Sequence, residues 1–126
     1  MSQPIESMLL RIYLGEQEKH GHEPLYQMLV AKARAMGLAG ATVLRGPLGF
    51  GRSGHVHTAK VLDLSQDLPL VIEMVDSEER LRAFAAAAAP LIADTLVTLE
   101  RVEVLRFGER PAAAGGGQTN LTSTTS

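Results

Sequence analysis

The sequence predicts an α+β domain in which two helices cover one face of a four-stranded antiparallel sheet. Segments of alternating polarity and segments with apolar residues at helical spacing follow one another in the order β-α-β-β-α-β. This order is the split βαβ, or ferredoxin-like, pattern. The length of 126 residues is that of one ordinary domain, which agrees with a single unit of this kind.

The first half of the chain supplies a strand, a helix and a second strand. Residues 8–14 place strongly apolar side chains at every second position, which predicts a strand with one apolar face. Residues 15–21 are expected to form a polar loop. Pro24 suits the first position of a helix, and Gly37 suits its end. Residues 41–44 then predict the second strand.

The second half opens with a glycine-rich segment, residues 45–54, for which we expect no regular element. Residues 56–64 and 70–75 are extended, and we interpret them as one long bent strand or as two strands. Residues 96–107 alternate weakly and predict the last strand.

The second helix is predicted between the third and last strands. Asp76 and Glu79 have the spacing of a capping box, with Asp in place of Ser or Thr. The alanine run of residues 85–89 favours a helix, and Pro90 is expected to end it.

These elements make residues 8–108 the predicted domain, preceded by a short N-terminal extension of residues 1–7. From Pro111 onward the chain has one large apolar side chain and no charged one. Such a segment buries too little surface to offset its conformational entropy. We therefore expect residues 109–126 to be a flexible, low-complexity tail.

The composition excludes several classes of protein. Lys and Arg number 12 against 14 Asp and Glu, a net charge of −2, whereas a nucleic-acid-binding domain normally has a basic excess. The absence of Cys excludes disulfides and thiolate catalysis. No apolar run approaches the roughly 18 residues of a membrane span, and we see no signal peptide at the N-terminus. We expect a cytoplasmic protein that does not bind nucleic acid.

One face of the predicted sheet is left without helices. Val71, Val75, Val97 and Leu99 offer apolar side chains there in adjacent registers. Because a large exposed apolar face is unusual in a monomer, we expect another subunit to cover it.

A resemblance to a known family rests on seven short stretches, which are Tyr13-Leu14-Gly15-Glu16, Pro24-Leu25-Tyr26, Leu38-Ala39-Gly40-Ala41-Thr42-Val43, Arg45-Gly46, Gly49-Phe50-Gly51, Asp67-Leu68-Pro69 and Glu73-Met74-Val75-Asp76. Together and in this order they resemble the PII-like family catalogued as domain-of-unknown-function family 190. The resemblance covers about residues 8–108.

The resemblance implies a homotrimer similar to PII signalling proteins. In those proteins, clefts between subunits bind adenine nucleotides near the base of the T-loop, which joins the second and third strands and reaches partner proteins. The equivalent loop here is residues 46–57, which is short and contains Phe50 but not the tyrosine that some PII proteins have modified. The implied function is regulation rather than catalysis, with a membrane transporter or another protein as the target.

The resemblance also implies a ligand and a set of site residues. The ligand would be AMP, ADP or ATP, and no cofactor is required. The Gly- and Lys-rich phosphate loop that follows the second helix of PII proteins is absent here, which suggests a ligand less charged than ATP or different phosphate contacts. The candidate nucleotide-binding residues are Arg45, Gly46, Gly49, Phe50, Gly51, Arg101 and Arg106.

The glycine-rich segment can also be interpreted from its residues alone. Residues 46–53 are one residue short of a P-loop, have Arg52 where Lys belongs, and precede a strand-like rather than a helical pattern. We therefore interpret the segment as a hairpin loop whose glycine N–H groups form an anion-binding nest. Glu16 precedes the first helix, where the helix dipole favours an acidic residue. A contact with a ribose or with a neighbouring subunit is the alternative for Glu16.

Four histidines support an alternative function. His20 and His22, and likewise His55 and His57, are two residues apart, so each pair can share a metal ion if it lies on a strand. The alternative is a metal-binding trimer resembling CutA, and solvent-exposed loop histidines are the simpler interpretation. No nucleophile and base have a spacing that indicates catalysis, so we expect that the protein is not an enzyme.

Overall fold

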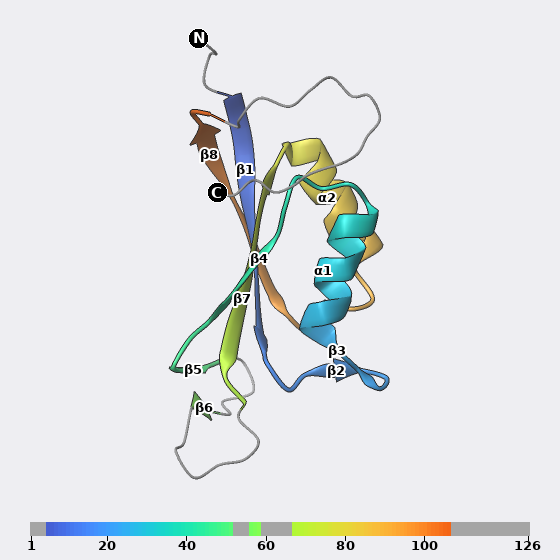
Figure 1. The fold of residues 1–126 in the computed structure, drawn as a ribbon, viewed down its shortest axis with the longest axis vertical. Helices are drawn as coiled ribbons and strands as arrows, with labels where there is room; N and C mark the ends of the chain where they lie inside the picture. Colours follow the sequence, from blue (N-terminus) through green and yellow to red (C-terminus); the bar gives the residue numbers. More distant parts are fainter. Residues whose placement is uncertain (1–4, 52–55, 59–66, 107–126) are drawn as a thin grey trace.

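The computed structural model describes residues 5–51, 56–58 and 67–106. These residues form two helices and eight strands (Figure 1). In chain order the elements are β1 (Ile5–Gly15), β2 (Lys19–His20), β3 (Glu23–Pro24), α1 (Leu25–Ala35), β4 (Thr42–Arg45), β5 (Leu48–Phe50), β6 (Val56–Thr58), β7 (Pro69–Asp76), α2 (Glu78–Ala87) and β8 (Leu96–Val104).

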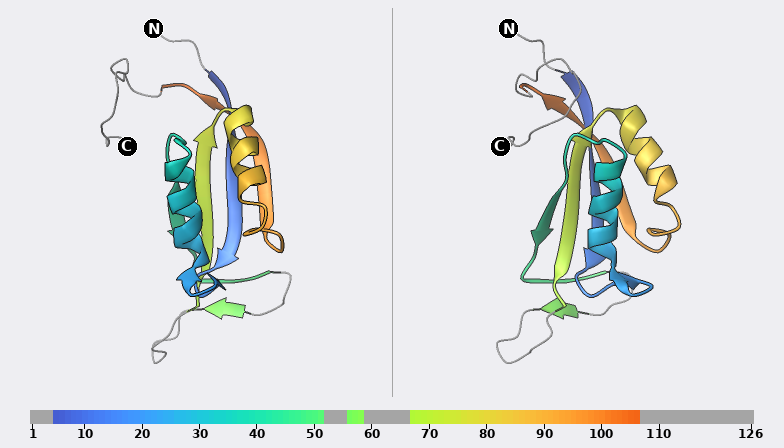
Figure 2. Two further views of the ribbon diagram at one scale, coloured as in Figure 1. Left: turned by 90° about the vertical axis from the view of Figure 1, so that its right-hand side faces the viewer. Right: turned by 45° about the vertical axis from the view of Figure 1, so that its right-hand side comes forward.

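The main sheet contains four antiparallel strands in the order β4-β7-β1-β8. Both helices lie on one face of it (Figure 2). The predicted fold class is confirmed, because each helix connects two strands that are not neighbours in the sheet, as the split βαβ pattern requires. The two edges of this sheet are β4 and β8.

The core lies between the sheet and the helices. Strand β1 alternates so that Leu10 and Ile12 are buried on the helix face, and Ile72 of β7 pairs with Ile12 on the same face. From the helices, Leu29 and Phe84 pack against them with no exposed surface. Every second residue of the strands and every third or fourth residue of the helices therefore point into one shared layer of apolar side chains.

The ends of α1 follow from its sequence. The sequence predicts Pro24 at the first helical position, whereas in the structure Pro24 is the N-cap and the helix begins one residue later, at Leu25. At the other end, Gly37 has a φ of 79°, Gly37 N donates to Arg34 O, and Leu38 N donates to Ala33 O. This is a Schellman motif, in which the left-handed residue is usually glycine, so the expected stop at Gly37 is confirmed.

The cap of α2 differs from the prediction. The N-cap is Ser77, whose Oγ accepts a hydrogen bond from Arg80 N at 3.2 Å. The prediction of Asp76 as the N-cap, in a capping box with Glu79, is therefore wrong, because the next residue caps the helix. Asp76 instead uses its carboxylate to accept from Ser77 N and from Ala39 N, at 2.7 and 3.0 Å. A hydroxyl directly before the helix outcompeted the carboxylate because it can reach the third N–H of the helix.

The glycine-rich segment contains a strand that the sequence interpretation did not predict. Leu48–Phe50 pairs with Val56–Thr58 as a separate two-stranded sheet, so the expectation of no regular element in residues 45–54 is wrong. The extended stretch that follows is two strands, β6 and β7, in different sheets. A second short hairpin, β2–β3, lies in and just after the predicted polar loop.

The register of β8 corrects the assignment of the open sheet face. Leu99 pairs with Leu10 and Val97 pairs with Ile12, so both side chains face the helices and pack against the core. Val71 and Val75 face the opposite way, since they alternate with buried residues of β7. The four residues predicted to share one face are thus divided between the two faces.

Other boundaries differ by a few residues. Strand β1 begins at Ile5, and α2 ends at Ala87, three residues before Pro90. The predicted tail of residues 109–126 lies outside the described residues. In the described part of the chain, no helix is long and apolar enough to cross a membrane.

Candidate functional site

Three strand ends meet at the base of the β5–β6 hairpin. Glu16 N, just after β1, donates to Leu68 O at 2.8 Å, and Gly46 N, just after β4, donates to Pro69 O at 2.8 Å. Gln17 N donates to the carboxylate of Asp67 at 3.1 Å. These bonds gather the ends of β1 and β4 and the start of β7 into one junction, from which the hairpin extends (Figure 1).

Two of the predicted glycines are needed at this junction for close contact. A Cβ at Gly46 or at Gly49 would approach Pro69 Cγ to 3.2 Å, which is tighter than nine in ten real contacts of this kind. The absence of a side chain therefore lets the hairpin lie against the proline ring. A Cβ at Gly51 would meet no atom within 4 Å, so Gly51 does not share this constraint.

The predicted site residue Arg45 has its guanidinium at the junction. Arg45 Nη2 donates to Glu16 Oε2 at 2.6 Å. The Arg45 side chain is 58% exposed, whereas that of Glu16 is 18% exposed. The cation is therefore accessible from solvent while its carboxylate partner is mostly covered. Such an exposed cation can bind an anion such as a phosphate. Gly46 N–H already donates to Pro69 O, so it is not available for the anion-binding nest that the sequence predicts.

The hairpin presents an apolar face to solvent. Leu48 and Phe50 share one face of β5, and Val56 lies opposite Phe50 on β6. Their exposures are 65%, 76% and 51%. The Phe50 side chain thus projects into solvent from the predicted loop and does not line the junction.

The two arginines predicted from the last strand lie at the other end of the sheet. Arg101 of β8 pairs with Met8 of β1. Arg45 of β4 pairs with Leu70 of β7, which in turn pairs with Leu14 of β1. The six residue steps along β1 from Met8 to Leu14 span about 20 Å. Arg106 lies beyond the end of β8 and is exposed. One subunit therefore does not bring these arginines together with Arg45.

Arg101 has contacts of its own at that end. Its Nη1 lies 4.0 Å from Glu78 Oε1 on α2 and 4.0 Å from the Met8 sulfur. Arg82 hydrogen-bonds the other oxygen of Glu78 at 2.8 Å. This hydrogen bond, followed by the charge of Arg82, lowers the pKa of Glu78 below its ordinary value.

The histidines of the alternative metal site are only partly described. His20 lies in β2 and His22 in the turn that follows, and both are exposed. His55 and the side chain of His57 fall outside the described residues. Among the residues that are described, no three His, Cys, Asp or Glu side chains come together as a metal site.

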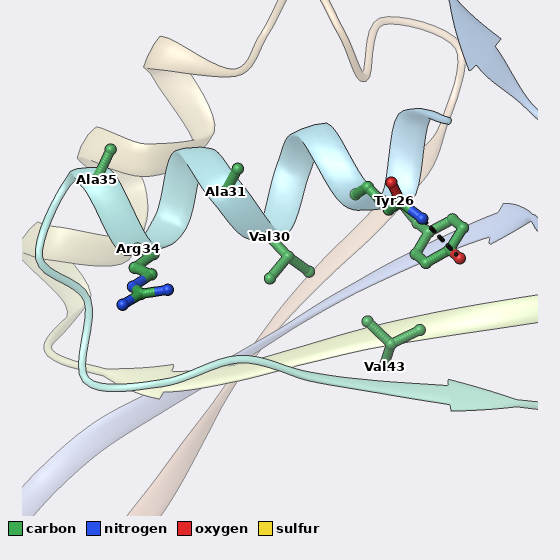
Figure 3. Close-up of a pocket in the computed structure, with 7 residues that line it drawn as sticks. Tyr26, Val30, Ala31, Arg34, Ala35 and Val43 are labelled. Atoms are coloured by element: carbon green, nitrogen blue, oxygen red, sulfur yellow. Dashed lines mark hydrogen bonds between the residues drawn. The ribbon is translucent and has the colours of Figure 1, made fainter. Parts of the chain in front are cut away.

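A groove that the sequence interpretation missed lies between α1 and the edge strand β4 (Figure 3). Its volume is about 650 Å³, within the range of ligand pockets, and Val43, one of the residues that line it, is two residues before Arg45 on β4. Gln27 Nε2 donates to Tyr26 Oη at 3.2 Å at one end of it. The lining residues are Tyr26, Gln27, Val30, Ala31, Arg34, Ala35 and Val43.

The open face of the sheet carries a three-strand ion-pair network. Arg11 of β1 hydrogen-bonds Glu73 of β7 through Nε at 3.0 Å and Glu100 of β8 through Nη1 at 2.6 Å. These bonds, that of Glu73 being the larger cause, raise the pKa of Arg11 above its already high value, so the cation is permanent. Apolar side chains that are 38% to 57% exposed lie on the same face, namely Tyr13, Leu44, Val75 and Leu96.

Solved structures with this fold include nucleotide-bound proteins. CPII from Thiomonas intermedia K12, a nitrogen regulatory PII-like protein bound to ADP, AMP and bicarbonate, superposes with a TM-score of 0.64 at 18% identity, over 82% of this chain and 92% of that one. A protein of Thermus thermophilus described as PII-like and signalling gives a TM-score of 0.58 at 16% identity, over 82% and 93%. These likenesses establish a PII-like fold.

Sequence relatives and a family model identify the family. Two UPF0166 proteins of Aquifex aeolicus (strain VF5) are 36% and 32% identical to the chain, over 80% and 79% of it and over 95% and 98% of their own lengths. The model of the DUF190 family, described as "Uncharacterized ACR", matches residues 7–104. The PII-like fold agrees with the resemblance stated from the sequence. The chain therefore belongs to the DUF190 family.

Proposed function

We propose that the protein is a PII-like regulatory protein that binds a small adenine nucleotide in clefts between the subunits of a homotrimer. The observation that carries the proposal is the junction, where the exposed guanidinium of Arg45 lies beside Gly46 and Gly49 at the base of a projecting hairpin. Support comes from the fold, since CPII has the same fold and is bound to ADP and AMP.

The trimer would form through the open sheet face. Taken together, the exposed apolar side chains of this face are unusual for the surface of a monomer. The charged side chains that the interface would cover are paired with one another in the Arg11 network. A cyclic trimer uses the same two surfaces in every subunit, so the site would be repeated three times.

The distance between Arg45 and the two arginines of the last strand fits a site shared by subunits. We assign Arg45, Gly46, Gly49 and Gly51 to one side of the cleft. Arg101 and Arg106 would approach the phosphates from the neighbouring subunit, because within one subunit the sheet separates them from Arg45 by about 20 Å.

The β5–β6 hairpin would transmit the signal. Ligand bound at its base would fix its position relative to Pro69, and the exposed face of Leu48, Phe50 and Val56 would then engage or release a partner. A membrane transporter or another protein target is the partner that the family resemblance implies. Phe50, predicted as a nucleotide contact, can serve either the ligand or the partner from this position.

The proposed role requires no cofactor and no catalysis, and we propose that the protein performs it in the cytoplasm. The residues of the junction are suited to bind an anion. They do not bring a nucleophile and a base within hydrogen-bond reach in the described part of the chain.

Isothermal titration calorimetry with AMP, ADP, ATP and cyclic AMP, with and without magnesium, tests the proposal. We expect saturable binding of at least one adenine nucleotide, and weaker binding by Arg45→Ala and Gly49→Val variants that remain trimeric. Asp94→Asn, a charge change in the exposed turn that joins α2 to β8, is the matched control. No binding by an intact trimer would refute the proposal, and unchanged affinity in both site variants would refute the site assignment.

A further inference from the structure

We propose that Glu16 sets the charge selectivity of the nucleotide site, because its carboxylate competes with the ligand's phosphates for Arg45. The inference rests on the proposed function and deepens it. It assigns the preferred ligand as a nucleoside monophosphate rather than a triphosphate. Neither the fold nor the family assigns this role to Glu16.

The contact geometry makes Glu16 a fixed competitor. Its Oε2 lies 2.6 Å from Arg45 Nη2, a short charge-assisted hydrogen bond. The backbone of Glu16 is held by the bond from its N–H to Leu68 O, directly before β7, and its side chain is only 18% exposed. The carboxylate therefore cannot move far into solvent when an anion approaches.

Arg45 is the partner that can move. Its side chain is 58% exposed, and it is the last residue of the edge strand β4, directly before Gly46. A phosphate that approaches Arg45 from solvent must share the guanidinium with Glu16 or displace it. The five N–H donors of a guanidinium permit sharing, but the two anions then repel each other across it.

The surrounding charges strengthen this competition. The carboxylate of Glu18 is also at this junction, where it accepts from Gly15 N at 3.0 Å. Each added phosphate charge on the ligand therefore meets carboxylates as well as the guanidinium. Repulsion grows with the ligand's charge, so the wild-type site should favour AMP over ADP, and ADP over ATP.

Replacing the carboxylate by its amide tests this directly. Glu16→Gln keeps the shape and a hydrogen-bond acceptor for Arg45 but removes one negative charge. We expect the affinity for AMP to rise about twofold, and that for ATP to rise about fivefold, given the strength of partly exposed ion pairs. The readout is the ratio of AMP to ATP affinity in the absence of magnesium, measured by calorimetry at two salt concentrations.

Matched variants separate a charge effect from a structural one. Asp94→Asn removes one carboxylate charge in the exposed turn between α2 and β8 and should change no affinity. Glu16→Asp keeps the charge and should keep the preference for AMP, which covers the case in which Glu16→Gln folds poorly. When Arg45 is also replaced by Gln, Glu16→Gln should change the ratio of AMP to ATP affinity less, because no guanidinium is left for which Glu16 and the phosphates compete. Circular dichroism melting checks that each variant is folded.

The outcomes distinguish this inference from the proposed function. If the wild type binds AMP and Glu16→Gln binds ATP more tightly, both stand. If the wild type binds AMP but Glu16→Gln leaves the AMP to ATP ratio unchanged or weakens all binding, Glu16 orients Arg45 and the selectivity role is wrong. If the wild type binds no nucleotide, the proposed function falls, and the inference falls with it whether or not Glu16→Gln binds one.

Discussion

Replacing Arg11 by Met should dissociate the proposed trimer while leaving the subunit folded. Arg11 is the only cation of the network, and its two bonds, of 3.0 and 2.6 Å, hold Glu73 and Glu100 from the strands on either side. Methionine keeps much of the length of the side chain and removes the charge. The two carboxylates are then left without this partner on the open face.

The magnitude depends on whether that face is covered. In an isolated subunit the three side chains are 30%, 32% and 57% exposed, and pairs of this kind contribute at most about 1 kcal/mol each. If other subunits cover the face, the unpaired carboxylates cost about 3–5 kcal/mol in each copy. At 1.4 kcal/mol for each factor of ten, association should weaken more than about a hundredfold.

Sedimentation velocity over a range of protein concentrations measures the assembly, and urea unfolding measures the subunit. A compensating variant in which Arg11→Met is combined with Glu73→Leu and Glu100→Leu should assemble again, because an apolar replacement leaves no buried charge. Retention of the trimer by Arg11→Met alone, with stability within about 1 kcal/mol of the wild type, would show that the open face is not the interface.

Three further predictions concern the junction and the second helix. Gly49→Val should push the hairpin away from Pro69 at a cost of about 1–3 kcal/mol, seen as faster amide exchange at the hairpin base, and unchanged exchange would contradict it. Ser77→Ala should lower the free energy of unfolding by about 1 kcal/mol in urea denaturation, and no loss would show that the cap is dispensable. Because its pKa is lowered from the ordinary 4.5, Glu78 stabilises the fold above that pH and loses this effect as the pH falls through its folded pKa. Arg82→Met should raise the pKa of Glu78 in an NMR titration, and an unchanged value would rule out Arg82 as the cause.

The sequence was a sufficient guide to the main architecture. Alternation in residues 8–14 predicted the buried face of β1, because only one register of a strand places Leu10 and Ile12 together. Gly37 predicted the end of α1, since few other residues adopt its backbone conformation. The succession of alternating and helically spaced segments predicted the fold and the order of the elements, and the family stretches agreed with it.

The site was predicted as a set of residues but not as an arrangement. Arg45, Gly46 and Gly49 meet at one junction, and the pairing of Arg45 with Glu16 follows from strand ends that are 29 residues apart in the chain. The contact of the glycines with Pro69 could have been sought from the glycines themselves, since each marks a close approach of the backbone. Arg101 was placed with them although it lies at the far end of the sheet.

Local signals along this chain determined which segments are helices and strands, because periodicity and the conformational preferences of glycine and proline act between near neighbours. Tertiary structure decided everything that depends on strand register. The pairing of Leu99 with Leu10 turned the apolar residues of β8 toward the helices, and the pairing of Phe50 with Val56 made a strand of a glycine-rich segment. Register is set by contacts between distant segments, and a shift of one residue reverses every side chain of a strand. The sequence alone therefore could not decide which charges share a face.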